Sequence, residues 1–139
     1  MEINEMVERA FNTATVKGWH DEGFEKLPLE CHMLMVSEIA EASEEVRKGT
    51  MPFYFEMNGK MVEPFDLSLA AFTVAEGFKL DGTINQKVLK KPEGELIELA
   101  DVMIRIGDYC GSRGWDLNAA VELKMKYNST RSIRHGKLK

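Results

Sequence analysis

Two pairs of acidic residues have the spacing and the surroundings needed for chemistry. Glu38 and Glu41 occur in the segment SEIAE, and Glu98 and Asp101 occur in ELAD. On a helix, residues at i and i+3 lie on one face about a turn apart, so each pair can direct both carboxylates toward one point. Carboxylates gathered away from water repel unless cations or protons compensate their charge. If the two pairs face each other, the spacing predicts a cation site.

The second pair lies in an apolar setting. Residues 96–110 read LIELADVMIRIGDYC, and their charged residues share one helical face: Glu98, Asp101, Arg105 and Asp108. A helix that is apolar around most of its circumference is normally buried, so this stripe faces either water or a wet internal site. Solvated faces stabilised by neighbouring Lys and Arg are the alternative interpretation for both acidic pairs, and periodicity leaves both open.

The ligand types restrict the cation. Hard carboxylate oxygens without Cys or His favour Mg²⁺, Mn²⁺ or Ca²⁺. A carboxylate-bridged di-iron site would have His three residues after a Glu, but those positions hold Glu41 and Asp101. Iron is therefore disfavoured.

Four helices are expected to position these residues. Apolar residues recur at i, i+3 and i+4, and Gly18, Gly49 and an Asp116 N-cap mark helix ends. The expected helices are residues 3–17, 29–48, 94–112 and 117–128. Between the second and third, FYFEM and KMVEP flank Asn58-Gly59, a dipeptide that favours a hairpin turn. Residues 67–78 are a possible short helix, and Asp81-Gly82 is a second possible turn.

These elements define an all-α protein. We expect a four-helix bundle with a small hairpin-containing insertion at residues 51–91, within a single domain of residues 1–139. Hydrophobic residues at 44% and charged residues at 29% are typical of globular proteins. An acidic N-terminus and the lack of a long apolar run predict a cytoplasmic protein without membrane contact. Cys31 and Cys110 fall in apolar patterns, which favours reduced thiols.

The charge is unevenly distributed along the chain. From Lys124 onward there are six Lys or Arg and no acid, so the preceding residues carry −11 of a total −5. Such an acidic body would repel a nucleic acid, and a small polyphosphate held between cations and the tail fits better. Lys124, Asn128 and Arg131 recur on one helical face and could bind phosphate oxygens. A solvated, basic helix end is the alternative.

Three segments together resemble the MazG-like all-α nucleoside triphosphate pyrophosphohydrolases: SEIAEASEEVRKG, KPEGELIELADVMIRIGDYCG and KMKYNSTRSIRHGK. The resemblance covers the four helices and the tail and leaves out residues 51–91. It implies that Mg²⁺, with Mn²⁺ as a possible substitute, is bound by the two acidic pairs, namely Glu38, Glu41, Glu98 and Asp101. It also implies that Lys124, Asn128 and Arg131 contact the nucleotide phosphates. The implied reaction is hydrolysis between the α and β phosphates to a nucleoside monophosphate and pyrophosphate, in nucleotide-pool housekeeping, by a helical homodimer or homotetramer.

Two features depart from the pattern of that family. The family usually has two adjacent Glu at the start of its first motif, and Ser37 occupies the first of these positions. Glu41 and Glu98 are 57 positions apart, which is longer than the usual linker. The insertion is expected to alter either substrate entry or a subunit interface. For that reason, the family's specificity for particular nucleotide bases is not carried over to this sequence.

Several roles stay open at this point. Glu41 or Glu38 would orient or deprotonate the attacking water, and Arg131, Lys124 or Arg105 would offset charge on the leaving pyrophosphate. Aromatic side chains could stack on the base or pack in the core, and the candidates are Trp19, Phe53, Tyr54 and Phe55.

Two other functions compete with the enzyme. A non-catalytic helical adaptor would use the acidic face and the basic tail for binding alone, and it would fold independently of metal. A histidine-based hydrolase is less well supported, because His20, His32 and His135 lack a Ser or Cys partner at a suitable spacing. Apolar residues beyond a single stripe on the second and third helices favour a homo-oligomer in either case.

Overall fold

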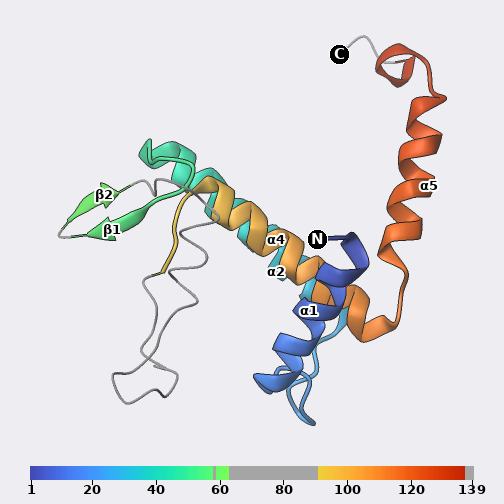
Figure 1. Ribbon diagram of the computed structural model, residues 1–139, viewed down its shortest axis with the longest axis horizontal. Helices are drawn as coiled ribbons and strands as arrows, with labels where there is room; N and C mark the ends of the chain where they lie inside the picture. Colours follow the sequence, from blue (N-terminus) through green and yellow to red (C-terminus); the bar gives the residue numbers. More distant parts are fainter. Residues whose placement is uncertain (58, 63–90, 137–139) are drawn as a thin grey trace. The chain divides into compact units, whose positions relative to one another are not determined.

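The computed structural model describes residues 1–57, 59–62 and 91–136 (Figure 1). Along the chain these form α1 (Ile3–Val16), α2 (Pro28–Lys48), β1 (Phe55–Met57), β2 (Lys60–Val62), α4 (Glu95–Arg113), α5 (Leu117–Ser129) and the 3-10 helix η1 (Ile133–Gly136). Over these described ranges, the predicted all-α class is confirmed, with four α-helices and a hairpin between the second and third of them. Each predicted helix end lies within two residues of its observed position.

The chain divides into two compact units. The terminal unit comprises Met1–Met33 and Met103–Lys139, and the central unit comprises Leu34–Val102. The boundaries fall within α2 and α4. All four acidic residues singled out above belong to the central unit.

In the terminal unit, α1 packs closely on α4 at two glycines. A Cβ atom on Gly111 would lie 2.5 Å from Cβ of Phe11, and one on Gly107 would lie 2.7 Å from Sδ of Met6. Helices approach this closely only where side chains are absent. Val7 and Ala10 of α1 and Cys110 of α4 are buried in this unit. Burial raises the pKa of the Cys110 thiol, and both cysteines are free thiols.

Polar contacts fix the start of α5 to α1. The predicted N-cap residue Asp116 accepts a hydrogen bond from the backbone N–H of Ala119 at 2.9 Å and another from the Asn4 side-chain amide at 3.0 Å. The Asn4 amide oxygen in turn accepts the N–H of Asn118 at 3.1 Å. The two hydrogen bonds that Asp116 accepts, first the one from Asn4 and then the one from Ala119, lower its pKa. None of the residues of α5, all of which the structure describes, is buried.

In the central unit, the hairpin has the predicted two-residue connection. β1 and β2 pair antiparallel from Phe55 with Val62 to Met57 with Lys60, and Gly59 has φ of 75°. Immediately before β1, Tyr54 exchanges two backbone hydrogen bonds of 2.9 Å with Glu93. The chain therefore enters and leaves residues 55–92 at paired backbone positions.

Some predictions lie outside the described residues, namely the possible helix at 67–78 and the possible turn at Asp81-Gly82. Among the helices that are described, none is both long enough and apolar enough to cross a membrane.

Candidate metal centre

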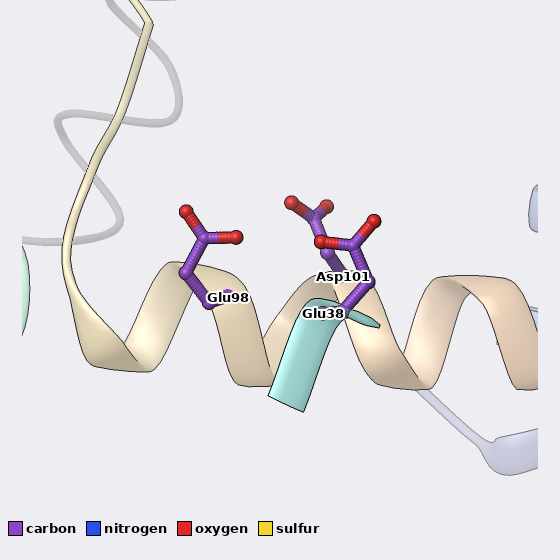
Figure 2. Close-up of side chains that lie close together, drawn as sticks. All are labelled: Glu38, Glu98 and Asp101. Carbon is purple, nitrogen blue, oxygen red and sulfur yellow. The ribbon is translucent and has the colours of Figure 1, made fainter. Parts of the chain in front are cut away.

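Three carboxylates from two helices converge in the central unit. Glu38 of α2 and Glu98 and Asp101 of α4 each offer one oxygen atom, and these atoms all lie within 4.8 Å of one another. Figure 2 shows the three carboxyl groups on the same side of α4. Glu38 and Glu98 are only 7% and 6% exposed, whereas Asp101 is half-buried. Three of the four predicted acidic residues, with members from both pairs, thus meet between α2 and α4.

The electrostatics of Glu98 reflect this crowding. Its pKa is raised from 4.5 to about 7, first by burial, next by a hydrogen bond to Glu41, and then by the negative charges of Glu41, Asp101 and Glu38. A carboxyl group near half-protonation at neutral pH marks a position where an additional positive charge would be favourable. The group could therefore exchange its proton for a metal cation.

Glu41 is placed differently from the other three. Its side chain is exposed, yet it is close enough to Glu98 to share a hydrogen bond. We call the cluster of Glu38, Glu98 and Asp101 the acidic group. Glu41 therefore lies at the solvent-exposed edge of the acidic group rather than inside it. Such a position suits a carboxylate that contacts both a bound cation and an incoming water molecule.

The local sequence explains how Glu98 is positioned. Its backbone N–H donates to the carbonyl of Gly94 at 3.1 Å, so Glu98 lies in the first turn of α4. Gly94 has φ of 118°, and a Cβ atom there would lie 2.3 Å from the carbonyl oxygen of Pro52. The positive end of the helix dipole favours the ionised form of Glu98 and opposes the effect of burial.

The donor set is compatible with a hard divalent cation. The group contains carboxylate oxygens and neither Cys nor His, the combination that Mg²⁺, Mn²⁺ and Ca²⁺ prefer. Two buried carboxylates leave some coordination positions for water or substrate oxygens.

The residues expected to bind phosphate belong to the terminal unit. Lys124, Asn128 and Arg131 are exposed, the first two on α5 and the third just after it. Lys124 Nζ lies 4.9 Å, and Arg131 Cζ 5.7 Å, from the centre of the Tyr127 ring. Arg105 of α4 is half-buried and engaged in an interaction. Their phosphate-binding role stays a prediction.

The remaining aromatic candidates differ in exposure. Trp19 is exposed, with Lys26 Nζ 4.6 Å above its ring, whereas Phe53 and Tyr54 are buried in the central unit. Phe55 packs edge-on against Phe53 with ring centres 5.5 Å apart. Two of the three aromatic residues of the PFYF segment are thus buried, and a stacking role for any of these aromatic candidates stays a prediction.

The histidines have separate surroundings. His20 contacts Asp108 at 2.6 Å, and the ring of His32 lies 5.4 Å from that of Tyr109. His135 falls within η1. Asp108, which shares the charged stripe of α4, thus has a partner of its own in the terminal unit.

Sequence reasoning missed two clusters. Glu45 is buried on α2, and its Oε2 accepts hydrogen bonds from Thr50 at 2.5 Å and Tyr54 at 3.1 Å. Tyr127 between two cations could have been found from the spacing of Lys124, Tyr127 and Arg131 on one helical face. The Glu45 cluster has no comparable signal, because Thr50 and Tyr54 follow the end of the helix.

Comparisons of the chain with protein-family models, with curated proteins and with solved structures gave no match. The resemblance to MazG-like enzymes therefore rests on the three sequence segments alone.

Proposed function

We propose that the protein is a divalent-cation-dependent nucleoside triphosphate pyrophosphohydrolase. The observation that carries the proposal is the convergence of Glu38, Glu98 and Asp101 within 4.8 Å, with two of the three side chains buried. A buried group of like charges is costly unless a cation occupies it. The three MazG-like segments add the substrate class.

The acidic residues divide naturally into two roles. Glu38, Glu98 and Asp101 would hold the cation, Mg²⁺ in the first instance and Mn²⁺ as a substitute. When bound, the cation polarises the α-phosphoryl group and lowers the pKa of water. Glu41, at the exposed edge, would orient the attacking water and accept its proton. The water oxygen bonds to the α-phosphorus, the bond from that phosphorus to the bridging oxygen breaks, and pyrophosphate leaves.

The cationic residues complete the proposal. A triphosphate carries more charge than a single divalent cation neutralises, so positive side chains are needed for the β and γ phosphates. Lys124, Asn128, Arg131 and Arg105 are the candidates for this role. The Tyr127 ring beside Lys124 and Arg131 limits the freedom of both side chains and so lowers the entropy cost of binding.

We also propose that the chain forms a homodimer or a homotetramer. In the central unit, five large apolar side chains are between 43% and 58% exposed: Val36, Ile39, Val46, Leu96 and Leu99. At about 100° per residue, Val36 points away from Glu38, and Leu99 away from Asp101, by roughly 160°. The faces opposite the acidic group are therefore apolar and suited to a second copy of the chain.

The proposal is tested by the identity of the products. Purified protein is incubated with a panel of ribo- and deoxyribonucleoside triphosphates and Mg²⁺, and the products are separated. We expect a nucleoside monophosphate with pyrophosphate, and loss of activity with EDTA and in the Glu98→Gln variant. Glu95→Gln is the matched control, because Glu95 is exposed in the same first turn of α4.

Other outcomes would reject the proposal. Release of orthophosphate would indicate cleavage at the γ phosphate and exclude the proposed reaction. Absence of turnover over the whole panel, together with metal-independent stability, would favour the helical adaptor.

A further inference from the structure

Glu45 is a buried acidic residue that lies outside the acidic group. It follows Glu38 by two turns on the same face of α2, a distance of about 10 Å along the helix axis. Its Oε2 accepts hydrogen bonds from two hydroxyl groups, those of Thr50 and Tyr54. Burying a carboxylate against neutral donors is expensive and contributes little to stability, so the arrangement calls for a specific role.

Tyr54 connects Glu45 to the start of α4. Its hydroxyl donates to Glu45, and its backbone N–H and carbonyl both pair with Glu93. Two residues earlier, the carbonyl of Pro52 accepts the N–H of Leu96 at 2.9 Å. The segment at 52–54 is thus hydrogen-bonded on one side to the end of α2 and on the other to the first turn of α4.

The connection ends at the acidic group itself. Gly94 lies against the Pro52 carbonyl so closely that a side chain would not fit, and its own carbonyl accepts the N–H of Glu98. Since Tyr54 and Pro52 fix residues 93–96, they also fix the turn from which Glu98 projects. Burial, followed by the interaction with Glu45, raises the pKa of Tyr54, so its hydroxyl remains a donor at neutral pH.

We propose that Tyr54 is a positioning residue for the acidic group: by linking Glu45 to the start of α4, it holds Glu98 in place opposite Glu38. We call the connection of Glu45, Thr50, Tyr54 and Glu93 the clasp. The inference rests on the proposed metal-dependent function, and its experiment separates the two.

The first measurement is the affinity for Mn²⁺ by isothermal titration calorimetry. Tyr54→Phe keeps the ring and the net charge but removes the hydroxyl. We expect its dissociation constant for Mn²⁺ to rise about tenfold, which is the lower end of the effects seen when residues that orient metal ligands are replaced. Thr50→Val, which removes the other hydroxyl donor to Glu45, should also raise the dissociation constant. Thr50→Ser retains that donor and should bind Mn²⁺ as the wild type does. Tyr109→Phe, in the terminal unit, is the matched control and should bind as the wild type does. A Tyr54→Phe protein that is folded and binds Mn²⁺ with wild-type affinity would refute the clasp.

The second measurement needs no metal. Amide hydrogen exchange of the metal-free protein reports the N–H groups of Leu96 and Glu98, whose acceptors are the carbonyls of Pro52 and Gly94. In Tyr54→Phe both should exchange faster, by at least tenfold relative to the amides of α1. Unchanged protection at Leu96 and Glu98, or a uniform loss throughout the protein, would overturn the positioning role. If wild-type protein binds no Mn²⁺, the proposed function fails, and the exchange result alone decides on the clasp.

Discussion

At the scale of single residues, Glu98 combines the features that define the candidate centre. It is the most buried acidic residue in the described part of the chain, it lies in the first turn of α4, and three other carboxylates act on it. Burial and like charges favour its protonated form, whereas the helix dipole favours the ionised form. Burial is the largest cause of its raised pKa, followed by the hydrogen bond to Glu41 and the charges of the neighbouring carboxylates. Glu98 is therefore the residue at which protons and cations compete most directly.

This competition gives metal-free protein a characteristic pH dependence. The pKa of Glu98 is about 7 in the folded chain against an ordinary 4.5, so the folded state retains a proton that the unfolded state releases. The free energy of unfolding should therefore decrease as the pH rises from about 4.5 to about 7, and the loss should be complete above that. Thermal unfolding in EDTA from pH 5 to pH 8 measures this decrease. Glu98→Gln should flatten the curve and be the more stable protein at pH 8, and parallel curves for the two proteins would contradict the assignment.

Divalent cations should reverse that loss at neutral pH. A ligand that binds only the folded state stabilises it by mass action, by about 2.7 kcal/mol at a concentration 100 times its dissociation constant. We expect Mg²⁺ or Mn²⁺ to raise the melting temperature of the wild-type protein at pH 7.5. The increase should persist in Glu95→Gln and disappear in Glu98→Gln. An equal increase in both variants would show that the cations act elsewhere.

At the scale of secondary-structure elements, α4 carries two different surfaces at its two ends. Near its N-terminus, Glu98 and Asp101 contribute to the acidic group, and near its C-terminus, Gly107 and Gly111 admit α1. The N-terminal part of α4 thus supplies carboxylates, and the C-terminal part supplies the close packing against α1. Substitutions at the glycines should affect stability without changing the donor set of the centre.

Gly111→Ala tests this division. The added Cβ would lie 2.5 Å from the Cβ of Phe11. Because the Cβ of Phe11 is bonded to the backbone and cannot rotate away, the two helices must move apart. Overpacking of this kind typically costs about 1–3 kcal/mol, which chemical denaturation would measure. Ser112→Ala, at an exposed neighbouring position, should change the stability by less than about 0.5 kcal/mol. Equal stability of Gly111→Ala and wild type would show that the α1 contact is not tight.

At the scale of the whole molecule, the exposed apolar faces predict self-association. Sedimentation equilibrium should give a mass of two or four times the 15.8 kDa chain. Val36→Lys places a charge on the apolar face of α2 and should shift the mass toward the monomer, because burying an unpaired charge is costly. Val16→Lys, at an 83% exposed position at the end of α1, is the matched control and should leave the mass unchanged. A monomeric wild-type protein would reject the oligomer.

Periodicity and turn chemistry predicted much of this molecule. The four helices followed from apolar spacing and end signals such as Asp116, and the hairpin followed from Asn58-Gly59. The approach of Glu38 to Glu98 was expected as one of two alternatives, because helical spacing gives the face of a residue but not what covers it. The partners of Glu45 were missed for a related reason, since the path of residues 50–54 after the helix depends on tertiary contacts. The burial of Glu98 and the exposure of Glu41 likewise depend on tertiary packing, which periodicity does not give.

The pairing of Tyr54 with Glu93 has a consequence for how the chain could be altered. Since the two residues are directly opposed, residues 55–92 could be excised and the strand ends joined by a two-residue turn such as Asn-Gly, without stretching the backbone at either side. The same junction would accept an unrelated peptide whose ends lie close together. An exchange at this junction would keep the two backbone hydrogen bonds between Tyr54 and Glu93.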